Sequence, residues 1–240
     1  MTVQLASLVW GASEPLHLAR FWAEALEWQI TGETDGKVSL MPADETGFTL
    51  VFAPGAAAKA GRNRIHLDLS SRSAEDQHAT VARLVGLGAS EINIGQEPDA
   101  RHVVLADPEG NEFCVLEPGN NFVTYASRLG SITCDGSRAA GQFWSQALRW
   151  PLVWDQDEET AVRAPDGAQQ FITWGPPVAP KRGQNRLHLD VAPPPGGDHG
   201  AEAERLLSLG AKRMGIGQSE TPRIVMADPD DNEFCVLAPR

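Results

Sequence analysis

The segment ADPEGNEFCVLEP at residues 106–118 returns almost unchanged as ADPDDNEFCVLAP at residues 227–239. Upstream of it, NRIHLDL at residues 63–69 returns as NRLHLDV at residues 185–191. Two such pairs at a nearly constant separation indicate an internal duplication, which decides the number of domains before any secondary structure is assigned. We therefore interpret the chain as two copies of one unit.

Each copy spans about 120 residues, a common size for a single domain. The first copy closes with Pro118-Gly119-Asn120-Asn121, a combination typical of a turn or a linker. We predict a first domain at residues 1–119 and a second at residues 124–240.

Composition narrows the class of partner. The chain has 20 Lys and Arg against 32 Asp and Glu, a formal net charge of -12. Such a surface repels phosphate backbones and anionic membranes, so we expect neither nucleic acid nor a membrane as partner. No apolar run approaches the roughly 20 residues of a membrane span, and three scattered cysteines suit a reducing compartment. We expect a soluble, cytoplasmic protein.

Both copies show the same order of predicted elements. A β-rich segment precedes a helix whose apolar residues follow the helical period, with Ser13 as candidate N-cap. These apolar positions are Leu18, Phe21, Trp22, Ala25 and Leu26, and in the second copy Ala140, Phe143, Trp144, Ala147 and Leu148. Further elements are predicted as strands at 37–41, 48–52 and 64–69, a helix at 73–87, and strands near 92, 103 and 113. Each copy is therefore βαβββ written twice, which predicts an α+β fold.

This order, with a His on the fifth strand and DPxGN before the last, resembles the vicinal oxygen chelate (VOC) superfamily. That superfamily includes glyoxalase I, extradiol dioxygenases, fosfomycin-modifying enzymes and bleomycin-binding proteins. The tandem form is most similar to glyoxalase-like domain proteins, and the resemblance covers essentially the whole chain. It implies two tandem VOC domains, each with two βαβββ modules that form a cupped mixed β-sheet with helices outside and a ligand pocket inside.

The resemblance also implies where a metal would be held. Metal-using members place ligands on the first and fifth strands, sometimes on the fourth, and seven residues after the Asp of DPxG. At these positions the present chain has Ser7 and Leu129, Thr49 and Phe171, His66 and His188, and Cys114 and Cys235. Only the histidines match an ordinary ligand, and one histidine cannot hold a divalent ion. We therefore predict no cofactor.

A divalent metal is the alternative. A thiolate binds zinc or ferrous iron, and a Glu two residues before the Cys shares its face of the strand. The alternative sites are His66, Glu112 and Cys114 in the first copy, and His188, Glu233 and Cys235 in the second. The competing interpretation is that a cysteine in the run FCVL is a small buried apolar residue, with the Glu at the rim of a pocket. We prefer the latter.

His66 and Asp68 lie two residues apart in a predicted strand and share a face, as do His188 and Asp190. Each Asp could hold an imidazole for acid–base catalysis. Equally, each pair could be a polar stripe whose members satisfy one another.

Phe52 and Trp174 end the fourth strands and are the candidate aromatic residues for a ligand pocket, together with Glu112 and Glu233. We expect a metal-independent protein that binds and sequesters a small organic molecule. The alternative is a lyase, isomerase or dioxygenase-like enzyme. Two copies in one chain also suggest a monomer with an internal pseudo-dimer, or a homodimer.

Overall fold

The computed structural model describes residues 2–44, 47–55, 59, 61–122, 127–165, 171–178, 180–215 and 223–239. The predicted join at residue 124 lies outside these ranges, so the boundaries at 119 and 124 stay a prediction. None of the described helices is long and apolar enough to cross a membrane.

Four βαβββ modules follow one another along the chain. The first contains β1 (Gln4–Ala12), α1 (Pro15–Leu26), β2 (Gln29–Thr34), β3 (Lys37–Met41) and β4 (Thr49–Pro54). The second contains β5 (Ile65–Leu69), α2 (Ala74–Gly86), β6 (Ser90–Glu91), β7 (Val103–Ala106) and β8 (Glu112–Val115). The third contains β9 (Leu129–Asp135), α3 (Arg138–Leu148), β10 (Leu152–Gln156), β11 (Glu159–Arg163) and β12 (Phe171–Gly175). The fourth contains β13 (Leu187–Ala192), α4 (His199–Ser208), β14 (Lys212–Arg213), β15 (Arg223–Ala227) and β16 (Glu233–Leu237).

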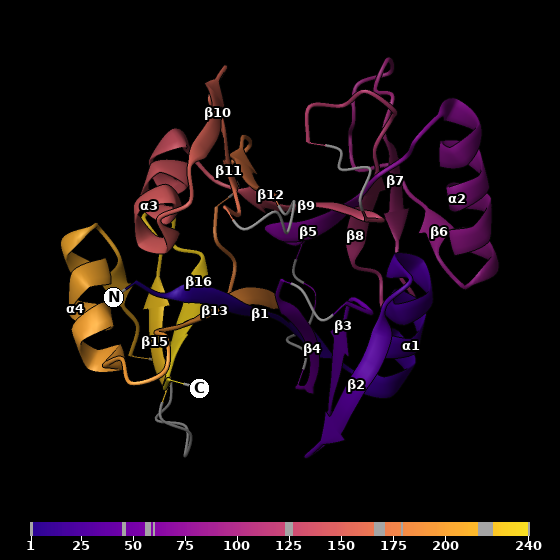
Figure 1. Ribbon diagram of the computed structural model, residues 1–240. Helices are drawn as coiled ribbons and strands as arrows, with labels where there is room; N and C mark the ends of the chain where they lie inside the picture. The colour runs from indigo at the N-terminus through magenta and orange to yellow at the C-terminus, as the bar shows by residue number, and fades with distance from the viewer. Residues whose placement is uncertain are drawn as a thin grey trace.

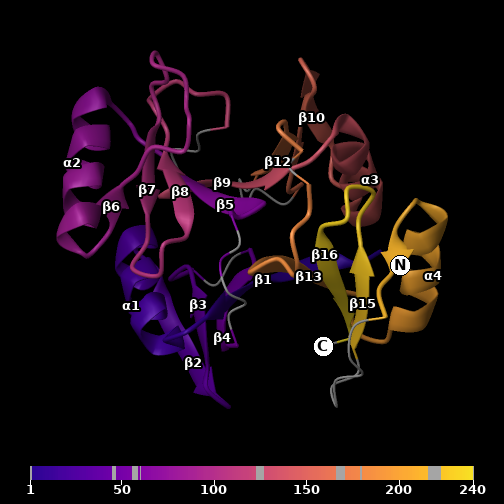
Figure 2. The same ribbon diagram turned by 180° about the vertical axis from the view of Figure 1, so that it is seen from behind.

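The modules build two mixed sheets of eight strands each. The first sheet has the order β14-β15-β16-β13-β1-β4-β3-β2, and the second has the order β10-β11-β12-β9-β5-β8-β7-β6. Helices lie on the flanks of the molecule, with β1, β13, β5 and β9 between them (Figures 1 and 2). The predicted α+β fold of four modules in two cupped sheets is confirmed.

Each sheet combines one module from each sequence copy. In the first sheet β1 runs antiparallel to β13, and in the second β5 runs antiparallel to β9. This pairing differs from the expectation that the two modules of one copy share a cup. The chain passes from the first sheet to the second between β4 and β5. A connection of roughly ten residues is long enough for this, because such a length can span about 30 Å when extended.

One hydrophobic core joins the two sheets. The predicted apolar face of α1 is buried, with Trp22 fully covered. Its ring lies 5.0 Å, centroid to centroid, from Phe113 of the second sheet, although α1 packs mainly on β3 and β4 of the first. Trp144 of α3 repeats this contact with Phe234, also at 5.0 Å. The sheets are therefore packed into a single unit.

Candidate ligand-binding site

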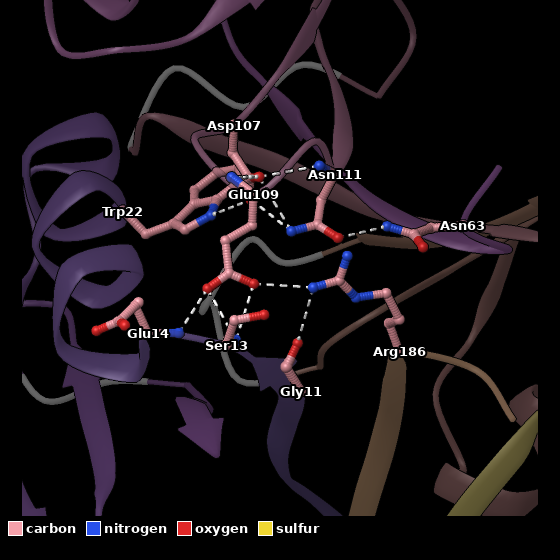
Figure 3. Close-up of polar contacts among 9 residues, drawn as sticks. All are labelled: Gly11, Ser13, Glu14, Trp22, Asn63, Asp107, Glu109, Asn111 and Arg186. Atoms are coloured by element: carbon pink, nitrogen blue, oxygen red, sulfur yellow. Dashed lines mark hydrogen bonds and ion pairs between the residues drawn. The ribbon is translucent and has the colours of Figure 1, made fainter. Parts of the chain in front are cut away.

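The DPxGN motif of the first copy and its counterpart DPDDN in the second each anchor one sheet to the helix of the other. The carboxylate of Asp107 accepts hydrogen bonds from the backbone N–H of Glu109 and Asn111, at 2.9 Å each, and from Trp22 Nε1 at 3.2 Å (Figure 3). Asp228 makes the same bond to Trp144, at 3.1 Å. The aspartate of the motif is therefore structural.

Glu109 extends this anchor. Its carboxylate accepts from the backbone N–H of Ser13 and Glu14, at 2.9 and 2.8 Å, and from Arg186 Nη2 at 2.8 Å (Figure 3). The N-cap of α1 is Glu14, and its side chain makes no capping bond. The expected Ser13 cap is therefore wrong, because the helix begins at Pro15 with Glu14 at the N-cap, and the Glu109 carboxylate binds the two N–H groups just before the helix.

The structure brings His66, Asp68 and Cys114 together on the cupped face of the second sheet. His66 Nε2 lies 3.3 Å from Asp68 Oδ1, and Cys114 pairs with Asp68 across neighbouring strands. Asp68 Oδ2 accepts from the hydroxyls of Ser131 and Thr133, at 3.1 and 2.6 Å. Nitrogen, oxygen and sulfur ligand atoms of the three residues all lie within 4.8 Å of one another.

The first sheet repeats this cluster with His188, Asp190 and Cys235. His188 Nε2 lies 3.4 Å from Asp190 Oδ1, and Ser7 donates to Asp190 Oδ2 at 3.2 Å. Within the described part of the chain, His188 Nε2 and Asp190 Oδ1 are buried without a hydrogen-bond partner. Val9 stands where the second sheet has Thr133, so this carboxylate receives one hydroxyl fewer.

The first-strand position of the second copy is Ser131, and the expected Leu129 is wrong. Ser7 pairs with Asp190 across β1 and β13, whereas Ser131 pairs with Asp68 across β9 and β5. Trp22 follows Ser7 by 15 positions, whereas the equivalent Trp144 follows Ser131 by 13, so counting back from the helix misplaced the strand by two residues. Both copies therefore keep a serine hydroxyl beside the carboxylate.

The surroundings of His66 in the second sheet shift its pKa. Burial by itself lowers the pKa of His66, but the Asp68 carboxylate and the Cys114 thiol outweigh this and raise the pKa well above 6.5. Burial likewise opposes ionisation of Asp68, whereas His66, Thr133 and Ser131 lower its pKa below 3.8. Both shifts favour the charged form of each group, an imidazolium beside a carboxylate.

The cysteines are protonated thiols. Burial, followed by the charge of Asp68, raises the pKa of Cys114 above 9.0. Burial and Asp190 raise the pKa of Cys235 to about 12. Neither thiol is a nucleophile at neutral pH, since the thiolate is the reactive form.

Glu112 and Glu233 are engaged elsewhere. Glu112 forms an ion pair with Lys59 and accepts from Asn63 N at 3.2 Å. Glu233 does the same with Lys181 and with the backbone N–H of Asn185, also at 3.2 Å. In the alternative metal sites, Asp68 therefore takes the place of Glu112 and Asp190 takes the place of Glu233, because these aspartates are the carboxylates that lie beside each His and Cys.

Phe52 and Trp174 lie in the core and not in a pocket. Their exposed fractions are 0% and 1%. Phe52 stacks on Trp10 with a centroid distance of 5.6 Å, and Trp174 stacks on Trp144 at 6.3 Å. Strand alternation explains the correction, because Phe52 points to the helix face while its neighbours Val51 and Ala53 line the cup.

A pocket of about 930 Å³ occupies the cup of the first sheet, which we call the first cup. Ser7, His188 and Asp190 line it, and so do Lys37, Arg186 and Arg223. Apolar contacts come from Val9, Met41, Val51 and Leu237. The sequence did not indicate the three cationic residues, because they come from three separate elements that carry no shared motif.

The second cup, the equivalent face around His66, carries aromatic side chains where the described lining of the first cup has none. Phe122 packs against Trp154 and Phe171, with centroid distances of 5.8 and 6.2 Å. Trp154 and Phe171 occupy the positions of Gly32 and Thr49 of the first cup, since they pair with equivalent residues. The two cups are therefore not equivalent, and the first is the candidate ligand site.

Comparison with known proteins agrees with this architecture. A family model described as a glyoxalase-like domain matches residues 7–116 and again residues 131–237. The structure is similar to glyoxalase I from Zea mays, with a TM-score of 0.64 and 12% identity over 99% of this chain and 92% of that one. The V278E mutant of that protein gives a TM-score of 0.65 at 13% identity, over 99% and 92%. No curated protein matches this chain.

Proposed function

Because the chain belongs to the family of proteins with a glyoxalase-like domain, we propose that it is a metal-independent protein that binds and sequesters a small organic molecule. The observation that carries this proposal is the pocket of about 930 Å³ in the first cup, beside the His188–Asp190 pair. A volume of this size falls within the range of pockets for small organic ligands, which is about 300–1,000 Å³.

The lining suggests the class of ligand. The pocket is lined by three cationic and two acidic residues together with apolar side chains. The charged residues are Lys37, Arg186, Arg223, Asp35 and Asp190. A molecule with an apolar body and an acidic or hydrogen-bonding group would fit this combination. Aromatic side chains are absent from the described lining of the pocket, so Phe52 and Trp174 give no support for a stacked aromatic ligand there.

The polar floor would orient the ligand. Ser7 fixes Asp190 through Oδ2, and Asp190 in turn faces His188. Asp190 thereby lies beside the imidazole of His188 without a metal between them. His188 Nε2 and Asp190 Oδ1 make no hydrogen bond with a described residue, so the cluster keeps hydrogen-bonding capacity.

The test introduces the aromatic residues of the second cup at the equivalent positions of the first cup. We expect the anionic aromatic dye 8-anilinonaphthalene-1-sulfonate to bind the wild-type protein with increased emission. Gly32→Trp with Thr49→Phe should abolish this binding while the melting temperature stays within a few degrees, because a Cβ at Gly32 meets nothing within 4 Å.

The matched control is Ile30→Trp on the same strand, since Ile30 is 42% exposed and does not line the pocket. It should bind the dye like wild type. Equal dye binding by the filled double variant would refute the first cup as the ligand site. Displacement of the dye then allows metabolites to be screened.

A second candidate function is a metal-dependent enzyme. It is favoured by the unpartnered His188 Nε2 and Asp190 Oδ1 beside Cys235, a donor set that fits zinc or ferrous iron once the thiol ionises. These three residues would hold the ion, which would act as a Lewis acid toward a substrate oxygen. Metal analysis of protein purified without chelator separates the two functions. About one ion per chain, lost in Cys235→Ser, would favour the enzyme, and none would favour the binding protein.

A further inference from the structure

A second cavity, of about 250 Å³, is lined by residues at the beginnings of β5 and β13. These two strands lie at the centre of the molecule, one in each sheet (Figure 1). Five cationic residues line it: Lys59, Arg62, Arg64, Arg182 and Arg186. Among the residues that the structure describes, no Asp or Glu lines it. In a chain with a net charge of -12, this concentration of positive charge is the opposite of what composition favours.

Two of these cations are already neutralised. Lys59 pairs with Glu112, and Arg186 pairs with Glu109. Arg62, Arg64 and Arg182 form no ion pair with any residue that the structure describes. Arg62 and Arg64 act at longer range on Asp135, whose pKa their charges lower against the effect of burial, but no described carboxylate lies within ion-pair distance of them.

Arg64 is the least satisfied of the three. It is only 7% exposed, and its Nε and Nη2 are buried without a hydrogen-bond partner among the described residues. Buried guanidinium groups in folded proteins are normally paired, because an unpaired buried charge is strongly destabilising. An anion in the cavity would supply the partner.

The duplication shows why Arg64 differs from its counterpart. Arg186 occupies the equivalent position and receives the carboxylate of Glu109 at 2.8 Å. The second copy has Asp230 in place of Glu109, one methylene shorter. Asp230 accepts from Ser137 N and Oγ, at 2.6 and 2.8 Å, and does not reach Arg64. One arginine is thus paired inside the protein, and the other is free to bind a ligand.

We propose that this cavity is a binding site for a small oxyanion of the phosphate class, with Arg64 as its central ligand and Arg62 and Arg182 contributing charge. A guanidinium presents its N–H groups in a planar fork that matches two oxygens of a phosphate. The site is distinct from the first cup, although Gln184, Asn185 and Arg186 line both.

The test measures phosphate-specific stabilisation. At equal ionic strength, we expect the melting temperature of the wild-type protein to be higher in inorganic phosphate than in chloride. Arg64→Met should lose this difference and bind phosphate at least about tenfold more weakly by calorimetry, because a hydrogen bond to a charged group is lost. Arg20→Met, which removes an exposed cation on α1, should respond like wild type.

A second comparison keeps the proposal falsifiable if the variant changes stability. In chloride, Arg64→Met should be at least as stable as wild type, because an unpartnered buried charge is removed. A marked loss of stability in chloride would mean that Arg64 has a partner within the protein, such as the nearby Asp135, and would overturn the proposal. So would an equal phosphate response in both proteins, or none in wild type.

The filled first cup separates this site from the proposed function. Gly32→Trp with Thr49→Phe should keep the phosphate response, and its loss would place the anion in the cup and overturn the proposal. Titration with glycerol 3-phosphate distinguishes the sources of the anion. Tighter binding than that of inorganic phosphate would assign the site to a phosphate ester, and weaker binding to the free ion.

Discussion

At the scale of single residues, strand alternation predicted which side chains would meet but not their charges. His66 and Asp68 were expected on one face of their strand, and Cys114 was expected beside His66 and Glu112, whereas the structure brings His66, Asp68 and Cys114 together. Glu112 was misassigned because its partner Lys59 comes from a connecting segment, whose path no periodicity reveals. The serine beside the carboxylate was missed in the second copy because two residues fewer separate it from the equivalent tryptophan of the following helix.

The imidazolium–carboxylate pair makes a testable prediction. Asp68→Asn removes the charge that raises the pKa of His66 and leaves burial, which lowers it, so the pKa should fall below that of wild type. NMR titration of the imidazole Cε1–H resonance measures this. Thr133→Val, which leaves the carboxylate in place, should keep the pKa of His66 above 6.5. An unchanged pKa in Asp68→Asn would show that Asp68 is not the cause.

The sign of the pH dependence follows. The folded pKa of His66 lies above its unfolded value, so protonated His66 stabilises the fold fully below about pH 6.5, and this stability is lost as the pH rises through the folded pKa. The difference in unfolding free energy between wild type and His66→Gln should therefore shrink with rising pH over that interval.

At the scale of elements, helices were predicted better than strands. The apolar face of α1 follows from the helical period, whereas β2 was not predicted because all six of its residues are exposed and show no alternation. The repeated motif was read as part of a candidate site, yet its aspartates join a turn to a helix that packs on the other sheet. A hydrogen bond between elements 85 residues apart is not visible in a local pattern.

This anchor can be measured. Trp22→Phe removes the N–H that Asp107 accepts and leaves a buried carboxylate with one donor fewer, so we expect destabilisation by about 1–3 kcal/mol. Trp28→Phe is the matched control, because none of the described hydrogen bonds involves its ring, and it should cost less. Urea unfolding gives both values, and equal losses would argue against the anchor.

At the scale of the whole molecule, the sequence predicted the number of modules but not their partners. Both arrangements, with modules of one copy or of two copies in each sheet, satisfy the same alternation of buried and exposed residues. The choice depends on the connecting segments and on contacts such as Trp22 with Phe113, which span the sheets. The result is an internal pseudo-dimer within one chain.

Module exchange predicts the behaviour of an isolated copy. Residues 1–119 contain β1 but lack β13, and if the exchange seen in the full chain is kept, β1 regains an antiparallel neighbour from β5 of a second copy of the fragment. This fragment should therefore be folded only as a dimer, which light scattering coupled to gel filtration can establish. A folded monomeric fragment would contradict the exchange.

The most direct test of the central claim is a dye titration on protein stripped of metal with a chelator. We predict one binding site for 8-anilinonaphthalene-1-sulfonate per chain, located in the first cup, with the same affinity before and after the metal is removed. Binding that disappears on stripping and returns with added zinc or ferrous iron would contradict it.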